Sequence, residues 1–256
     1  EFRQRNQLSA VNSINWARVM AQTVYYVTAS EMFDEPVTFS VPTGNFGNVL
    51  AGWIARKMGA PIRDFIISSN TNDILTRFIN DNDMSARAVI PSLSPSMDIQ
   101  VSSNFERLLF EMNGRDGGMT AEQMRRFRAT GKLLIEPDQR ATFLSGSIRA
   151  AAFDDARTLA EIKRVYDATG GYVVEPHTAT ATAAARMLSA NDGGGPVITL
   201  ATAHPAKFPD AVEQATGFRP ELPAHLADLF DREERTQTVA NDLATVQALV
   251  EELTAR

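Results

Sequence analysis

The sequence predicts an α/β protein, with helices packed on both faces of a mostly parallel sheet in a three-layer αβα arrangement. The first observation behind this is the unit between residues 37 and 68, where a buried strand, a glycine-rich turn, a helix and a second buried strand follow one another. Such a connection joins two parallel strands by a right-handed crossover. The second is composition, because 256 residues with 44% hydrophobic and 22% charged side chains can build one sizeable core. No repeat or low-complexity linker divides the chain, so we expect a single α/β domain over residues 1–256 with a helical extension at about 219–256.

The predicted elements begin with a largely buried helix at 13–30, whose N-cap is Asn12 or Ser13 because a short polar side chain there accepts from a free amide. VTFSV (37–41) and DFIIS (64–68) have the apolar character of buried strands. Between them, NVLAGWIARKMG (48–59) is a helix that ends at Gly59, with Pro61 just beyond. Periodicity and turn residues predict the remaining elements: helices at 72–81, 102–113, 120–130, 139–153, 155–168, 177–190 and 206–215, strands at 171–174 and 196–202, two helices within 223–255, and loops at 114–118 and 191–196.

Composition and charge argue against several classes of function. A net charge of −6 gives no sign of a nucleic-acid surface, and the densest basic cluster, Arg125, Arg126 and Arg128, fits a solvated helix face. No apolar stretch reaches the ~20 residues that cross a bilayer, and the opening EFRQRNQ is unlike a secretory signal, so we expect a cytoplasmic protein with no membrane partner. The absence of cysteine and the three scattered histidines argue against a metal site. Because the chain begins at Glu1 without a methionine, we expect a fragment of a longer protein.

Gly44 and Gly47 lie between the end of the first strand and the start of the next helix. Exposed amides and the helix dipole at such a junction favour an anion, and glycines allow close approach and left-handed angles that form a nest of N–H donors. Asn45 and Asn48 add neutral donors. The turn lacks the Lys-Ser/Thr pair of a nucleoside triphosphate loop, the G-x-G-x-x-G dinucleotide fingerprint and an acidic ribose ligand after the second strand. The predicted ligand is therefore a single phosphate group on a cofactor or a sugar; a tight connection that binds nothing is the alternative.

The stretch PTGNFGNVLAGWIARKMGAPI (42–62) resembles the cofactor-phosphate loop and following helix of the threonine synthase family, pyridoxal 5′-phosphate enzymes of fold type II. The resemblance covers nearly the whole chain, since five further stretches match in the family's usual order: NSINWARVMAQTVYY (12–26), SNTNDILTRF (69–78), SPSMDIQVSSNFERLLFE (94–111), GYVVEPHTATATAA (171–184) and LATAHPAKFPDAVEQATG (200–217). It implies the large, C-terminal domain of an enzyme that converts O-phospho-L-homoserine and water to L-threonine and inorganic phosphate.

The resemblance also implies residue roles for the cofactor. The hydroxyl of Thr202, which ends the last predicted strand, faces the pyridine nitrogen, and plain capping of that strand end is the alternative. A neutral hydroxyl leaves the nitrogen largely unprotonated and so moderates the cofactor's action as an electron sink. The phosphate of pyridoxal 5′-phosphate is held by the turn residues Gly44, Asn45, Phe46, Gly47 and Asn48.

The lysine that forms the Schiff base lies, in the family, ahead of the part matched by NSINWAR, and that segment is not in this sequence. We therefore expect no catalytic residue in this chain and no turnover by the chain alone. The missing N-terminal part of the same enzyme is its expected partner.

The candidate contacts for the substrate O-phosphohomoserine lie at two places. Lys207 follows a strand end and is expected to face the cleft, whereas Lys57, Lys132 and Lys163 fit surface positions. His204 nearby is a candidate polar contact, with a hydrogen-bonded turn residue as the alternative. At the start of the first helix, Asn12, Ser13 and Arg18 place donors and a guanidinium where a second anion would bind, with capping as the alternative for the first two.

Two further segments are candidates for the cleft. Glu175, Pro176 and His177 precede an Ala- and Thr-rich helix, in which Thr178 and Thr180 cap the helix or approach the cleft, and SPSMD (94–98) is a candidate substrate-side loop. Phe105, Leu108, Leu109 and Met112 fall at helical spacing and are expected in the core. Two other functions stay open: a serine/threonine dehydratase-like reaction, and a non-catalytic module that binds a phosphorylated metabolite.

Overall fold

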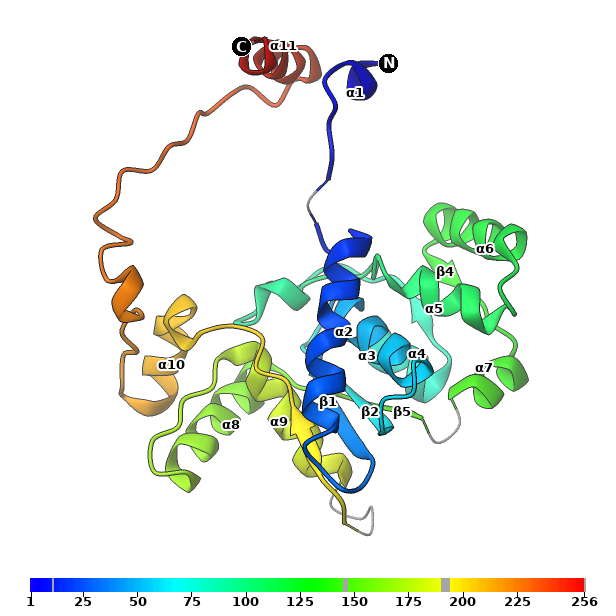
Figure 1. The fold of residues 1–256 in the computed structure, drawn as a ribbon, viewed down its shortest axis with the longest axis vertical. Coiled ribbons are helices and arrows are strands. Elements are labelled where there is room, and N and C mark those ends of the chain that lie inside the picture. The colour runs from blue at the N-terminus through cyan, green and yellow to red at the C-terminus, as the bar shows by residue number, and fades with distance from the viewer. Residues whose placement is uncertain (11, 145–146, 190–193, 256) are drawn as a thin grey trace.

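The computed structural model describes residues 1–10, 12–144, 147–189 and 194–255, and its centre is a four-stranded parallel sheet (Figure 1). The strands are β1 (Val37–Pro42), β2 (Ile62–Ser69), β5 (Ile148–Ala152) and β6 (Val197–Thr199), in the order β5-β2-β1-β6. Phe39 of β1 pairs with Phe65 of β2 on one side and with Ile198 of β6 on the other. Every residue of β1 is buried, as expected for a strand of a parallel sheet that is covered on both faces.

Helices cover both faces of this sheet, which confirms the predicted three-layer αβα fold (Figure 1). Phe65 and Ile67 of β2 belong to the large core that includes α2 (Trp16–Ser30) and α3 (Gly47–Lys57). Ile66 points to the opposite face and packs against α9 (Pro176–Ser189). The other α-helices of this α/β body are α4 (Ile74–Asp81), α5 (Phe105–Met112), α6 (Gly117–Thr130), α7 (Pro137–Leu144), α8 (Asp155–Ala168) and α10 (Pro209–Thr216).

Small residues let the flanking helices approach the sheet closely. A Cβ added to Gly52 of α3 would lie 2.6 Å from the Phe65 ring and 2.7 Å from the Tyr26 ring. On the other face, the carbonyl of Ala181 in α9 accepts from the Ser40 hydroxyl at 2.7 Å, and the Ser68 and Thr180 hydroxyls are 2.8 Å apart. The Ala- and Thr-rich composition of α9 therefore serves close packing on the polar strand residues beneath it.

The first long helix differs from its prediction in two ways. It begins at Trp16, and its N-cap is Asn15, whose side chain accepts from the Ala17 amide, so the assignment of Asn12 or Ser13 as the N-cap was wrong. The helix is also not largely buried, because only Val19, Tyr26 and Ser30 are shielded from solvent. The other face of α2 exposes apolar side chains: Trp16 (51%), Met20 (52%) and Val24 (60%).

Three other predictions were wrong. The helix expected at 139–153 ends at Leu144, and residues 148–152 form β5, because pairing with β2 overrides the helical propensity of its alanines. No strand forms at 171–174, where the chain is a turn and coil before α9. The strand expected at 196–202 is only β6, so Thr202 lies three residues beyond its end. A short antiparallel pair, β3 (Met84–Ser85) with β4 (Lys132–Leu133), was not predicted.

The two ends of the chain lie side by side, away from the sheet (Figure 1). α1 (Phe2–Arg5) contacts α11 (Leu243–Thr254) through an ion pair between Arg5 and Glu251 and a hydrogen bond from the Thr254 hydroxyl to Asn6. The two predicted tail helices are in fact one 3₁₀ turn, Ala224–Leu226, and α11. The loop at 114–118 is shorter than predicted because α6 begins at Gly117. Residues 191–193 of the loop predicted at 191–196 lie outside the described residues, and residues 194–196 form no helix or strand, as predicted. None of the described helices combines the length and hydropathy needed to cross a bilayer.

Candidate functional site

A cavity of about 230 Å³ opens at the carboxyl end of β1, where parallel sheets bind ligands. The turn between β1 and α3 forms its floor, and segments from four other places in the sequence form its walls. The walls come from the start of α2, the segment around η1 (Pro95–Met97), the start of α9 and the residues after β6. The residues used below that line the cavity are Ser13, Arg18, Gly44, Asn45, Phe46, Gly47, Asn48, Ser96, Met97, His177, Thr202, Lys207 and Phe208.

The turn at 44–48 directs its polar backbone groups to two different sides. The carbonyl of Gly44 accepts from the Ser102 hydroxyl at 2.9 Å, and the carbonyl of Asn45 accepts from the backbone and side-chain N–H groups of Asn104. Within the described part of the chain, the N–H groups of residues 44–48 donate to no protein acceptor. The turn therefore offers a set of free amide donors at the floor of the cavity, next to the N-terminus of α3.

The two glycines of the turn have a different role from the one predicted. The residue in the left-handed region is Phe46, with φ of 60°, and not Gly44 or Gly47. Its ring anchors this conformation, because it is 2% exposed and packs edge-on against Phe105 at 5.8 Å. Gly44 is needed for space, since an added Cβ would lie 2.7 Å from the carbonyl oxygen of Ser96.

Asn48 is oriented by two tyrosines of α2. Its Oδ1 accepts from the hydroxyl of Tyr25 at 2.5 Å and from that of Tyr26 at 2.9 Å. Burial raises the pKa of Tyr25 to about 12 and raises the pKa of Tyr26 well above its usual value, so both phenols stay protonated donors at neutral pH. Asn48 lines the cavity, and its Nδ2 group makes no hydrogen bond with another described residue, so it is available as a donor.

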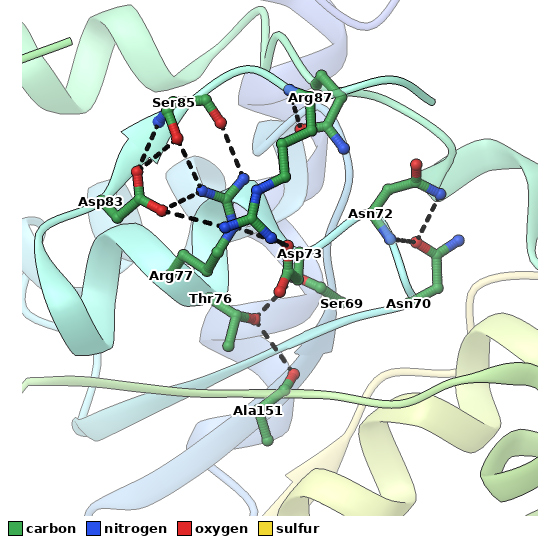
Figure 2. A network of polar contacts seen from close by, with 11 residues as sticks. Ser69, Asn70, Asn72, Asp73, Thr76, Arg77, Asp83, Ser85, Arg87 and Ala151 are labelled. Carbon is green, nitrogen blue, oxygen red and sulfur yellow. Dashed lines mark hydrogen bonds and ion pairs between the residues drawn. The ribbon is translucent and has the colours of Figure 1, made fainter. Parts of the chain in front are cut away.

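The wall that contains Ser96 is anchored to the end of β2. Figure 2 shows Asn70 and Asn72 joined at this strand end, where the Asn72 N–H donates to Asn70 Oδ1 at 2.8 Å. Asn70 Nδ2 donates to the Ser92 hydroxyl and to Asp98 Oδ1, both at 2.7 Å. Asp98 in turn accepts from the Ser92 N–H at 2.9 Å. The segment 92–98 is thus closed into a compact loop and held against Gly44.

Two cationic side chains are among the residues that line the cavity. Arg18 and Lys207 both line it, and neither makes an ion pair with another described residue. The other lysines are exposed, as predicted: Lys57 pairs with Glu111, Lys163 pairs with Asp167, and Lys132 lies in β4. Two unpaired cations beside free amides suit a ligand with more than one anionic group.

Two of the candidate residues do not line the cavity. Asn12 is exposed, and its Oδ1 accepts from the Ile14 N–H at 3.1 Å. His204 is exposed and caps η2 (Pro205–Lys207), with its Nδ1 accepting from the Ala206 N–H at 3.2 Å. Ser13, by contrast, lies in the wall of the cavity.

A buried carboxylate lies behind the cavity, in the Glu-Pro-His segment that was predicted from the sequence as a cleft candidate without a role for Glu175. Glu175 is completely buried, and His177 beside it is 4% exposed. Glu175 accepts from the Thr178 hydroxyl at 2.6 Å and from the Thr202 hydroxyl at 3.4 Å, and its other oxygen is 2.6 Å from Nδ1 of His177. The signal in the sequence is a Glu-Pro-His-Thr run at a helix start, but burial of its first residue is a tertiary property.

Comparisons with known proteins place this chain beside threonine synthases. A family model described as "Threonine synthase, C-terminal" matches residues 178–250. A threonine synthase of Pseudomonas aeruginosa is 51% identical over 253 residues, which cover 97% of this chain and 53% of the relative. The crystal structure of a PLP-bound threonine synthase from Brucella melitensis superposes with a TM-score of 0.93 at 43% identity, covering 100% of this chain and 55% of that one.

This chain is similar in sequence and in structure to one half of known threonine synthases. It spans about half the length of the threonine synthases that it matches. Likeness to a threonine deaminase from Solanum lycopersicum, at 12% identity and a TM-score of 0.54, extends to the fold alone. The fold is therefore that of fold-type II enzymes, and the likeness to threonine synthases extends to the sequence, at 51% and 43% identity in the two proteins above.

Proposed function

We propose that this chain forms the phosphate-binding half of a threonine synthase active site, with pyridoxal 5′-phosphate as cofactor and O-phospho-L-homoserine as substrate. The whole enzyme would release L-threonine and inorganic phosphate. The observation that carries this proposal is the row of free backbone amides at residues 44–48, facing a cavity with two unpaired cations.

The residues of the turn fit the phosphate of this cofactor. The donors are neutral amides together with Asn48 Nδ2, and no Asp or Glu is among the residues that line the cavity. The absence of a side chain at Gly44 leaves room for the Ser96 wall to close directly over the floor of the cavity. A phosphate monoester needs several N–H donors in a concave arrangement at a helix N-terminus, and the turn supplies them.

Two further contacts complete the proposed site. Thr202 lines the cavity with a neutral hydroxyl, which is suited to a pyridine nitrogen that stays largely unprotonated. Arg18 and Lys207, with Ser13, are placed to bind the phosphate of the substrate. When bound, pyridoxal 5′-phosphate supplies the electron sink for the reaction, and the protein supplies orientation and charge.

The lysine that carries the cofactor is proposed to come from residues other than these 256. Lys57 and Lys163 are in surface ion pairs, Lys132 is exposed, and none of these three lines the cavity. Lys207 lines the cavity, and we assign it as an electrostatic contact for an anion and not as the lysine that carries the cofactor. We therefore expect this chain to bind the cofactor weakly and to catalyse no turnover alone.

Titration of the purified chain tests the phosphate site. We expect pyridoxal 5′-phosphate to bind about tenfold or more tightly than pyridoxal, which lacks the phosphate, because the free amides act on the phosphate alone. Asn48→Ala should weaken binding of the phosphorylated form only. Arg115→Ala, an exposed arginine outside the cavity, serves as the control. Equal affinity for the two ligands would contradict the assignment of residues 44–48 as the binding site for the cofactor phosphate.

A chimera tests the reaction. The N-terminal half of the Pseudomonas aeruginosa threonine synthase, joined to residues 1–256, should release phosphate from O-phosphohomoserine and little ammonia from threonine. Arg18→Ala and Lys207→Ala in this chimera should mainly raise KM for O-phosphohomoserine, because they remove ground-state contacts to its phosphate. Ammonia release as the main activity would instead assign a dehydratase-like reaction. Failure of the chimera to release either product, with the cofactor bound, would favour a binding module.

A further inference from the structure

Glu175 is a buried carboxylate whose oxygens are both occupied. One oxygen accepts from the Thr178 N–H at 2.8 Å and the Thr178 hydroxyl at 2.6 Å, with the Thr202 hydroxyl at 3.4 Å. The other accepts from the His177 N–H at 2.8 Å and lies 2.6 Å from Nδ1 of the His177 ring. A carboxylate with no solvent exposure stays ionised only when it is fully hydrogen-bonded, and Glu175 meets this requirement through its neighbours.

The contacts of His177 select one protonation state and one tautomer. Nδ1 faces an acceptor-only carboxylate, and Nε2 accepts from the backbone N–H of Ser96 at 3.2 Å. Only the neutral ring with its proton on Nδ1 satisfies both partners, since a donor at Nε2 would face another donor. The Phe208 ring packs on the imidazole with centroids 4.8 Å apart and keeps it in place from another side.

Glu175 therefore connects two walls of the cavity that are far apart in the sequence. Through His177 it holds the Ser96 amide, in the segment that closes against Gly44. Through Thr178 it holds the other wall, because the Thr178 hydroxyl accepts from the Thr202 N–H at 3.2 Å. The turn, Ser96 and Thr202 all line the cavity, so their relative positions set the space in which the ligand would bind.

We propose that Glu175 and His177 form a positioning unit. The carboxylate fixes His177 as its Nδ1–H tautomer, so that Nε2 holds the Ser96 segment over the phosphate-binding turn, and through Thr178 it also positions the backbone of Thr202. This role rests on the proposed function, because the ligand to be enclosed is pyridoxal 5′-phosphate. Glu175 and His177 are positioning residues and transfer no group.

The sharpest variant is Glu175→Gln. The amide keeps an oxygen for Thr178, but its NH₂ group then faces Nδ1 of His177, so the imidazole must move its proton to Nε2. The Nε2–H group would point at the Ser96 N–H, and the hydrogen bond between them would be lost. His177→Gln is the complementary variant, because its side-chain oxygen can take the place of Nε2 as the acceptor for Ser96.

Three measurements on the purified chain decide the matter. The ¹⁵N shifts of the ring nitrogens, in a protein with only three histidines, should report the Nδ1–H tautomer for His177 in the wild type and its loss in Glu175→Gln. Amide hydrogen exchange in residues 92–98 should become about fivefold or more faster in Glu175→Gln, in line with one lost hydrogen bond. Affinity for pyridoxal 5′-phosphate should fall by about tenfold, because the site is no longer held in its binding geometry. His177→Gln should keep slower exchange and tighter binding than Glu175→Gln.

Glu161→Gln is the matched control, because it makes the same substitution at another buried glutamate, which pairs with Arg164 and Arg186 away from the cavity. It should leave exchange in residues 92–98 and cofactor affinity unchanged even where it lowers thermal stability. An unchanged tautomer and unchanged exchange in Glu175→Gln would overturn the positioning unit. If the wild type does not distinguish pyridoxal 5′-phosphate from pyridoxal, the proposed function fails, while the tautomer and exchange data still decide whether the unit exists.

Discussion

Gly44 and Phe46 contribute to the proposed phosphate-binding turn in different ways. Phe46 adopts the left-handed backbone angle although it has a side chain, because its buried ring is anchored against Phe105. Gly44 has an ordinary backbone angle but no space for a Cβ next to the Ser96 carbonyl. Packing of the Phe46 ring thus supports the left-handed backbone angle. A glycine is required at position 44 because the Ser96 carbonyl lies too close for a side chain.

Gly44→Ala should therefore impair the site more than the fold. The added methyl group must push the Ser96 segment outward, and overpacking of this kind destabilises a protein by about 1–3 kcal/mol. We expect affinity for pyridoxal 5′-phosphate to fall by about tenfold or more, measured by titration alongside thermal unfolding. Gly117→Ala is the control, because its Cβ would meet nothing closer than 3.9 Å at the start of α6. Wild-type affinity in Gly44→Ala would contradict this use of the glycine.

At the scale of elements, α4 is joined to β3 by an arginine network (Figure 2). Arg77 of α4 is 7% exposed and donates to Asp73 at 2.8 Å, to Asp83 at 2.5 Å and to the Ser85 carbonyl at 2.9 Å. Burial alone would lower the pKa of Arg77, but its hydrogen bonds to Asp73 and Asp83 and the negative charges of these carboxylates outweigh burial, and the pKa is raised. The guanidinium thus ties α4 to β3.

Arg77→Met should lower the free energy of unfolding by about 2–3 kcal/mol, since it leaves two partly exposed carboxylates and a carbonyl without their donor. Urea unfolding measures this. Arg87→Met supplies the comparison, because Arg87 contacts the same Asp83 but its side chain is 58% exposed, and its loss should change stability by at most about 0.5 kcal/mol. Similar losses in the two variants would show that burial does not set the strength of this network.

α8 and α9 are joined by Glu161, which makes the stability of this pair dependent on pH. Burial raises the pKa of Glu161, but hydrogen bonds from Arg164 and Arg186 lower it more, so the pKa in the folded state lies below its ordinary value of 4.5. The contribution of Glu161 is therefore fully present above pH 4.5 and is lost as the pH falls through the folded-state value. Melting temperatures from pH 6 to 3 should fall more steeply in the wild type than in Glu161→Gln, and parallel curves would contradict the linkage.

The elements that could be predicted from sequence are those defined by local pattern. The unit from β1 through α3 to β2 was predicted because its strands are rich in large apolar residues and Gly59 follows the end of its helix. β5 was missed because Arg149 and three alanines carry no strand signal, and only pairing with β2 makes them a strand. The exposure of α2 was missed because apolar density does not show what covers a helix.

At the scale of the whole molecule, the candidate site is assembled from segments up to about 190 residues apart in the sequence, from Ser13 to Lys207. The turn at 44–48 and the cations Arg18 and Lys207 were predicted, because a glycine turn after a strand and charges at element ends have local signals. The link from Glu175 through His177 to Ser96 could not be predicted, because it joins residues about 80 positions apart through burial. Asn12 and His204 were equally polar in the sequence, but folding places them outside the cavity.

The paired chain ends, α1 and α11, form a part of the molecule that is distinct from the α/β body. Residues 231–241 are exposed, and α11 buries none of its residues, so its contact with α1 consists of surface interactions that contribute little to stability. Deletion of residues 231–256 should therefore leave the melting temperature within about 2 °C and leave affinity for pyridoxal 5′-phosphate unchanged. Deletion of residues 209–256 is the contrasting change, because it also removes Ala211 and Val212, which α10 buries next to the cavity wall that holds Lys207. This longer deletion should lower both stability and affinity, and a large loss with the shorter deletion would show instead that the paired ends support the body.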